Sequence, residues 1–97
     1  MTEEQNTYIK TWVANNIHIK EDRWLEIDLS DVYNDDTLWN IDEESYQIKK
    51  YLRNSIDYDE LTSDEKALYD EALSLCSYID ELCRAWLYAT PENWEAP

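Results

Sequence analysis

Residues 62–89 read TSDEKALYDEALSLCSYIDELCRAWLYA and carry the longest helical pattern of the chain. Thr62 and Glu65 have the spacing of a capping box, which marks a helix start, and Pro91 prevents the helix from continuing. Within this stretch, apolar residues recur at steps of four and three, at Leu68, Ala72, Leu75, Ile79, Leu82 and Trp86. The spacing predicts a C-terminal helix about 40 Å long with one apolar stripe.

The apolar stripe of this helix allows two interpretations. It is the core-facing side of a helical bundle, which we favour, or it is the seam of a homodimer. The residues of the possible dimer seam are Leu68, Leu75, Ile79, Leu82 and Trp86. A structure of one chain with these side chains buried would favour the core.

A first helix is predicted near the N-terminus. Thr2 and Gln5 again have capping-box spacing, and Asn15 and Asn16 provide its end. One face of this predicted helix is apolar and consists of Tyr8, Ile9, Trp12 and Val13.

A second helix is predicted from Asp42, which can cap it, with Glu43 and Glu44 at the positive end of the helix dipole. Its inward side chains are Ile48, Tyr51, Leu52 and Ile56. Residues 30–40 fit a loop or a short helix.

Residues 17–29 have a different pattern. Ile17 and Ile19, and then Leu25, Ile27 and Leu29, alternate with polar residues, and period two is typical of strands. We therefore expect a mainly α domain with a short β-ribbon at residues 17–29, and an α+β fold as the alternative. Residues 1–97 are expected to form a single acidic domain in which residues 90–97 fray.

The charge of the chain limits its partners. Against 23 Asp and Glu stand 8 Lys and Arg, which gives a formal net charge of -15. Direct binding to nucleic acid or to an anionic membrane needs basic residues, so neither is expected, and any partner attracted by charge is basic. Glycine is absent, which excludes the loops that cradle phosphates in P-loop and dinucleotide-binding folds. With no secretory or membrane-spanning segment apparent, we expect a cytoplasmic protein.

Catalysis and metal binding have little support in the residues. Cys76 and Cys83 lie about 10 Å apart along one predicted helix, too far for a disulfide, and His18 is the single histidine. The run from Asp31 to Asp42 lacks the glycine and the final Glu of a calcium loop. We therefore expect no metal, no cofactor and no enzyme activity.

The acidic residues gather in two blocks that contain almost no bases. The first block comprises Asp35, Asp36, Asp42, Glu43 and Glu44. The second block, continued into the C-terminal helix, comprises Asp57, Tyr58, Asp59, Glu60, Asp64, Glu65, Asp70 and Glu71. Tyrosine is common at interfaces, so we predict that both blocks contact a partner.

The amount of charge matches that of duplex DNA. A compact domain of this length is about 30 Å across, and 30 Å of duplex carries about 18 phosphates. In size, acidity, aromatic content and lack of glycine the chain resembles the small phage or mobile-element DNA mimics that block restriction enzymes or CRISPR effectors. The resemblance is one of character and assigns no residue a role. It implies an inhibitor that competes with nucleic acid for the basic surface of a host DNA-binding protein.

Two other functions fit the same residues. An antitoxin or immunity protein would use the acids to block the basic site of a nuclease. A structural homodimer would use the apolar seam and leave its acids in contact with solvent only.

Overall fold

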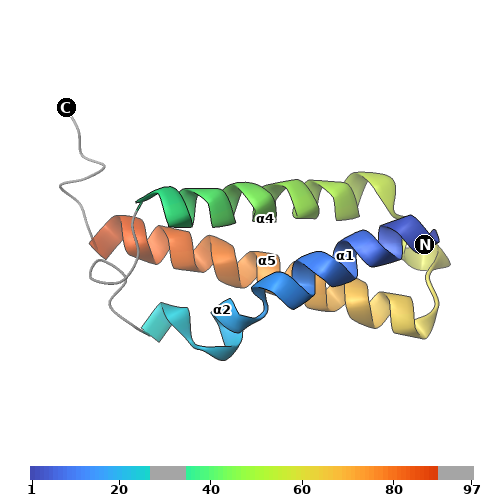
Figure 1. The fold of residues 1–97 in the computed structure, drawn as a ribbon. Coiled ribbons are helices and arrows are strands. Elements are labelled where there is room, and N and C mark those ends of the chain that lie inside the picture. The colour runs from blue at the N-terminus through green and yellow to red at the C-terminus, as the bar shows by residue number, and fades with distance from the viewer. Residues whose placement is uncertain (27–34, 90–97) are drawn as a thin grey trace.

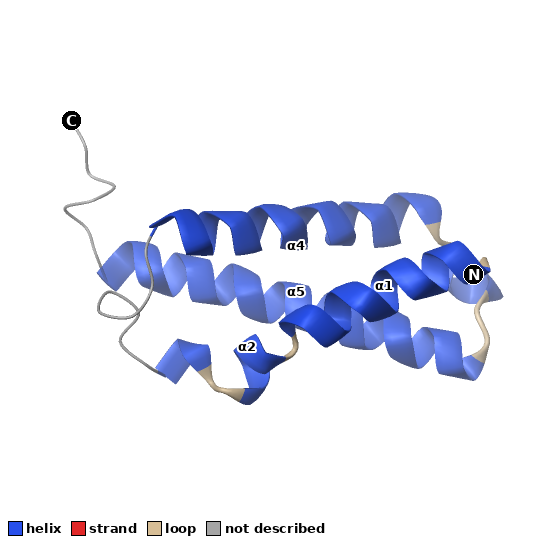
Figure 2. Cartoon of the chain, in the orientation of Figure 1, coloured by secondary structure: helices blue, strands red, loops and turns tan. Residues whose placement is uncertain are grey.

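The computed structural model describes residues 1–26 and 35–89, and the side chains of residues 1–26 and 38–85. Its elements are α1 (Glu3–Asn16), α2 (His18–Glu21), η1 (Trp24–Glu26), α4 (Asp35–Ser55), η2 (Tyr58–Glu60) and α5 (Ser63–Ala89) (Figure 1). The described residues form helices and loops and include no strand (Figure 2). The predicted mainly α fold is confirmed.

The three long helices lie side by side. α1 and α5 begin at the same end of the molecule and run in the same direction, whereas α4 runs the opposite way (Figure 1). α5 contacts both α1 and α4, and α2 and η1 pack against α5 beyond the end of α1. The molecule measures 46 × 28 × 18 Å, longer and narrower than the compact domain about 30 Å across that the length suggests.

The N-terminal helix α1 has the predicted capping box. The Thr2 hydroxyl accepts a hydrogen bond from the Gln5 N–H at 3.1 Å, and the Gln5 side chain accepts one from the Thr2 N–H at 2.9 Å. α1 ends at Asn16 as predicted, where the Asn16 amide donates to the Trp12 carbonyl at 2.8 Å. Trp12 is buried, but Tyr8 at the edge of the apolar face is 45% exposed.

The predicted β-ribbon is wrong for residues 17–26. Ile17 has helical backbone angles, so the chain passes from α1 into α2 without extending, and η1 follows. Ile19 is buried, and Ile17 and Leu25 pack against the core while partly exposed, so the apolar spacing that resembled a strand comes from helical residues that contact the core. Arg23 turns the chain between α2 and η1 with a positive φ of 56°, where many proteins place glycine. Ile27 and Leu29 lie outside the described residues.

The predicted start of the second helix is also wrong. α4 begins at Asp35, so Asp42 lies inside the helix and does not cap it. The inward face of α4 includes Leu38 as well as the predicted Ile48 and Leu52, all of which are buried. The helix begins about two turns earlier than expected, because Leu38, which contacts the core, lies within an acidic stretch that resembled a loop.

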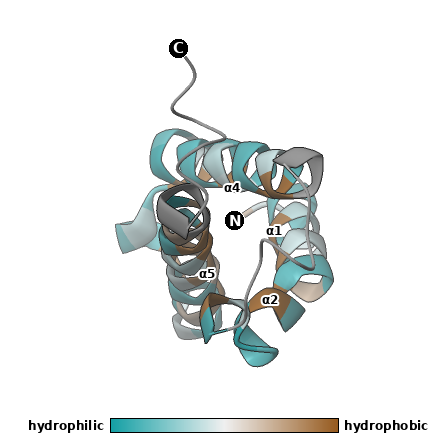
Figure 3. Ribbon diagram, turned by 90° about the vertical axis from the view of Figure 1, so that its left-hand side faces the viewer, coloured by the Kyte–Doolittle hydropathy of each residue, from teal (hydrophilic) through white to brown (hydrophobic). Residues whose placement is uncertain are grey.

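The long helix α5 begins with the predicted capping box. The Thr62 N–H donates to the Glu65 carboxylate at 2.9 Å, and the Glu65 N–H donates to the Thr62 hydroxyl at 3.2 Å. Its apolar stripe faces inward (Figure 3), and Leu75, Ile79 and Leu82 are fully buried within one chain. Each such side chain contributes about 1.5–3 kcal/mol to stability. These three residues are therefore part of the core, and in this arrangement they cannot contact a second copy of the chain.

The core gathers side chains from all the described helices except η2. Its members are Ile9, Trp12, Val13, Ile19, Trp24, Leu38, Ile48, Leu52, Leu61, Tyr69, Ala72, Leu75, Cys76, Ile79 and Leu82. Leu68 is half-buried at the edge of this core, and the Trp86 side chain and residues 90–97 lie outside the described residues.

Candidate functional site

The second acidic block surrounds the turn between α4 and α5. We call Asp57, Tyr58, Asp59, Glu60, Asp64 and Asp70 the turn cluster, and all six are exposed. The Asp57 carboxylate accepts a hydrogen bond from the Asp59 N–H at 3.1 Å and so caps η2. This bond fixes the short helix that carries Tyr58, Asp59 and Glu60.

Tyr58 is held in place from three sides. Its ring packs edge-on against buried Tyr69, with centroids 5.0 Å apart, and its hydroxyl donates to Oδ2 of Asp70 at 3.2 Å. The Tyr69 hydroxyl in turn donates to the Leu52 carbonyl at 3.3 Å. Lys66 places its ammonium group 5.3 Å from the centre of the Tyr58 ring. The cluster therefore presents a fixed aromatic group among its carboxylates.

The surroundings of Tyr58 disfavour its ionised form. Desolvation, the hydrogen bond to Asp70 and the negative charges of Asp70 and Asp59 raise the pKa of the Tyr58 phenol above its ordinary value. At neutral pH the phenol is protonated and donates to Asp70, so it cannot also be a negative group of the cluster.

Glu65, which is predicted to contact a partner, makes two contacts within the chain. Besides closing the capping box of α5, its carboxylate pairs with the amino group of Met1 at 2.8 Å. This bond and the hydrogen bond from Thr62 lower the pKa of the Glu65 carboxyl. The side chain is partly buried and committed to joining α1 and α5.

α1 adds two acids that the sequence blocks did not include. Glu3 and Glu4 occupy the first turn of α1, which begins at the same end of the molecule as α5 (Figure 1). Glu3 and Asp64 line one surface pocket of about 460 Å³ between the two helices. Capping boxes at Thr2 and Thr62 are the sequence signal for two helix starts, but only the parallel packing of α1 and α5 brings their acids together.

The first acidic block is divided between two sides of α4. Glu44 lines a groove toward α1, Asp42 turns toward α5 and is half-buried, and Glu43 lies between them and lines the hollows on both sides. Burial, followed by the negative charges of Asp80 and Glu43, raises the pKa of the Asp42 carboxyl. Asp35 and Asp36 begin α4, and their side chains lie outside the described residues.

The two acidic blocks do not join into one surface. They are separated along α4 by about 16 Å, the rise of the eleven residues from Glu44 to Ser55, where the helix ends. Three of the chain's bases, Lys49, Lys50 and Arg53, lie in this interval. The structure thus presents two acidic regions with a basic segment between them.

Few acids form ion pairs in the part of the chain whose side chains are described. Among the described side chains, ion pairs join Arg23 to Glu26 at 3.5 Å and Arg84 to Asp80 at 3.2 Å, in addition to the pair made by Glu65. Asp59, Glu60 and Asp64 have no such pair in that part of the chain. Glu71 is exposed and follows Asp70 on α5. We leave it out of the turn cluster because Tyr58 forms its hydrogen bond with Asp70.

The aromatic residues of α4 and α5 differ widely in exposure. Tyr69 is buried beneath Tyr58, and Tyr78 is half-buried with its hydroxyl accepting from the Leu25 N–H at 3.2 Å. Trp39 and Tyr46 on α4 are 68% and 59% exposed. Because they are seven residues apart, both lie on one side of the helix. This pair is not apparent from the sequence, because the predicted helix begins after Trp39.

The cysteines are poorly suited to thiolate chemistry. Burial raises the pKa of the Cys76 thiol, and burial together with the charges of Asp42 and Asp80 raises that of Cys83 to about 12. Both thiols are therefore protonated at neutral pH. The described side chains contain no group of three or more His, Cys, Asp or Glu that could hold a metal ion. Within residues 1–26 and 35–89, no helix combines the length and apolar character needed to span a bilayer.

Comparison with known proteins adds no family. No protein-family model matches the chain, and neither the curated proteins nor the solved structures yield a significant match. Function must therefore be inferred from the residues and their arrangement.

Proposed function

We propose that this protein is a binding module that inhibits a nucleic-acid-binding protein by occupying its basic surface. In this proposal the carboxylates stand where phosphates would lie, and no catalytic step, metal or cofactor is involved. The partner and the protein meet in the cytoplasm, where Cys76 and Cys83 stay reduced.

The observation that carries this proposal is the turn cluster. It concentrates exposed carboxylates that have no basic partner within the described residues around a tyrosine fixed on the core. A partner's Lys and Arg side chains could pair with Asp59, Glu60 and Asp64 without first breaking internal ion pairs. Because Tyr58 is already held by Tyr69, little side-chain freedom is lost when a partner packs on it.

The gathering of this charge at one end of the molecule favours a second candidate of the same kind. An antitoxin or immunity protein that plugs the basic cleft of a nuclease needs a compact acidic end rather than a long track. The interruption of the acidic surface by Lys49, Lys50 and Arg53 fits such a plug. Both candidates predict competition with nucleic acid, and they differ in whether the partner is itself a nuclease.

Charge reversal of the turn cluster tests the proposal. The variant Asp59→Lys, Glu60→Lys, Asp64→Lys leaves Asp57, which caps η2, unchanged, and it changes the formal charge by +6, from -15 to -9. A partner is isolated from lysate on the immobilised protein with a salt gradient, and its affinity is then measured in solution with and without duplex DNA. We expect DNA to compete, and the variant to bind the partner at least a hundredfold more weakly, since several charge-assisted hydrogen bonds of about 1.5–3 kcal/mol each are lost.

The matched control reverses the same amount of charge elsewhere. Glu21→Lys, Asp22→Lys, Glu81→Lys alters exposed acids of α2, of the turn after it and of α5, which have no ion pair among the described side chains and lie away from the turn cluster. This control should bind as the wild type does. If both variants lose affinity equally, the effect is one of net charge, and if DNA and the protein bind the partner together, the proposed competition is wrong. A partner that cleaves nucleic acid would favour the antitoxin over the DNA mimic.

A further inference from the structure

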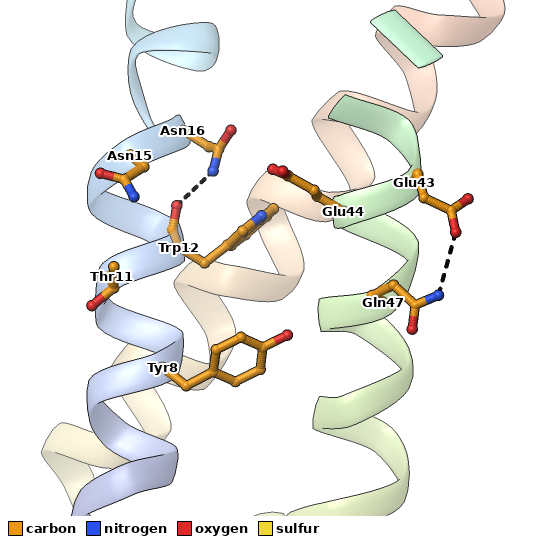
Figure 4. Close-up of a pocket in the computed structure, with 8 residues that line it drawn as sticks. All are labelled: Tyr8, Thr11, Trp12, Asn15, Asn16, Glu43, Glu44 and Gln47. Atoms are coloured by element: carbon orange, nitrogen blue, oxygen red, sulfur yellow. Dashed lines mark hydrogen bonds between the residues drawn. The ribbon is translucent and has the colours of Figure 1, made fainter. Parts of the chain in front are cut away.

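A groove of about 570 Å³ lies between α1 and α4, away from the turn cluster (Figure 4). Its lining residues are Tyr8, Thr11, Trp12, Asn15 and Asn16 from α1, and Glu43, Glu44 and Gln47 from α4. Two of the eight are acidic, none is basic, and two are aromatic. Its volume lies in the range of sites that bind small molecules or short peptide segments.

Trp12 leaves a hydrogen-bond donor of this groove unused. The residue is 8% exposed, and its indole nitrogen Nε1 is buried without a hydrogen-bond partner. The neighbouring Asn16 amide is directed to the Trp12 carbonyl at 2.8 Å and so does not serve the indole. In Figure 4 the indole reaches from α1 toward α4 with its nitrogen on the side of Glu44. A buried donor without an acceptor is unfavourable, so an acceptor brought by a ligand would be bound with a gain in free energy.

The α4 side of the groove selects positive charge. Glu43 and Glu44 are both exposed. The Glu44 carboxylate points toward the α1 wall, whereas Glu43 points away from it and accepts a hydrogen bond from the Gln47 amide at 3.4 Å (Figure 4). Beyond Tyr8, an adjoining hollow of about 280 Å³ is lined by Lys50 and Tyr51. A cation is therefore favoured at the Glu43 and Glu44 end and repelled from the Lys50 end.

We propose that this groove binds an arginine-bearing peptide segment of a protein partner. The guanidinium pairs with Glu44, to which Glu43 adds negative charge nearby, and stacks on the exposed ring of Tyr8, as the planar group of arginine does and the ammonium of lysine does less well. A main-chain carbonyl of the same segment accepts a hydrogen bond from Nε1 of Trp12, which binding uncovers. The inference rests on the proposed function in taking the partner to be basic, but it assigns a separate site with its own chemistry.

The test uses the blocked peptide acetyl-Arg-Arg-Arg-amide as the probe. It is titrated into ¹⁵N-labelled protein while the indole N–H signal of Trp12 is followed, a signal identified by its loss in Trp12→Phe. We expect this signal to move downfield and saturate as its hydrogen bond forms. The corresponding citrulline peptide, which has the same shape without the charge, should leave the signal in place.

Paired variants locate the effect. Glu43→Gln, Glu44→Gln should weaken binding reported by the Trp12 indole roughly tenfold or more, and the matched Asp59→Asn, Glu60→Gln should change it less than twofold. The proposal is overturned if the Trp12 signal stays fixed while other signals respond, if the citrulline peptide binds equally well, or if Glu43→Gln, Glu44→Gln has no effect. None of these outcomes bears on the turn cluster, because competition with DNA is measured there with a different variant.

Discussion

The Tyr58 hydroxyl donates a hydrogen bond to Oδ2 of Asp70 across 3.2 Å, while the Tyr58 ring packs edge-on against Tyr69. An exposed tyrosine is in this way joined to a carboxylate on its outer side and to a buried ring on its inner side. The acidic surface of the turn and the core of the molecule therefore share one side chain.

Because of this arrangement, Tyr58 makes the stability of the protein decrease at high pH. The pKa of Tyr58 is raised in the folded state, so the folded state favours the neutral phenol. The stability that this residue contributes is present below the unfolded pKa, near 10, and is lost as the pH rises toward the folded pKa. We expect Tyr58→Phe to lose less stability than the wild type between about pH 10 and 11. Urea unfolding at a series of pH values measures this, and an identical decline in both proteins would contradict it.

Asp42 is expected to reduce stability at neutral pH. Its folded pKa is raised, mainly by burial and then by Asp80, so the folded state disfavours the charged form, and stability increases as pH falls through the folded pKa. Asp42→Asn should raise the free energy of unfolding at pH 7 by less than about 1 kcal/mol, because the side chain is only partly buried and solvent screens its charge. The gain should disappear below about pH 4. Glu71→Gln, at an exposed position, should show no such gain.

Leu75 tests the assignment of the apolar stripe to the core. The residue is fully buried, so Leu75→Ala should lower the free energy of unfolding by about 2–5 kcal/mol, and Leu75→Asp should leave the chain unfolded. Leu75→Met, which conserves volume, should cost less than about 1.5 kcal/mol. Circular dichroism and light scattering on the three variants check this. A folded, soluble monomer from Leu75→Asp would show that the stripe serves contacts between copies.

Added salt should stabilise the protein. The net charge of -15 is only sparsely offset by ion pairs within the described residues, and acids of the turn cluster lie within a Debye length of about 8–10 Å of one another. A stabilisation of about 1 kcal/mol between low and moderate salt would raise Tm by about 4–8 °C. Calorimetry at several NaCl concentrations measures the change. A flat or falling Tm would show that repulsion among these acids is weak.

The parts of the fold that follow from local rules could be predicted. Capping boxes at Thr2 and Thr62 and the stripe through Leu75 depend on spacing within one helix, and the structure confirms all three. Residues 17–26 could not be predicted correctly, because a short helix against a core and a strand both need an apolar residue at intervals. The short helix forms here because it buries Ile19 against helices that are distant in sequence, and the local pattern does not show that contact.

The candidate sites show the same division. Which residues are acidic is evident from the sequence, but Glu3 approaches Asp64 only because α1 and α5 are parallel. Asp42 and Glu44, two residues apart, face different neighbours because a helix turns about 100° per residue. Trp12 fits the core pattern of α1, and nothing in that pattern indicates that its indole nitrogen has no acceptor.

The parallel packing of α1 and α5 has a consequence for the order of folding. Seven residues separate α4 from α5, whereas 46 separate α1 from α5. Closing the longer connection costs about 1.7 kcal/mol more in chain entropy. The α4–α5 hairpin is therefore expected to form first and α1 to dock on it last. Pulse-labelling hydrogen exchange during refolding should show amides of α4 and α5 protected before those of α1, and simultaneous protection of all three helices would contradict this order.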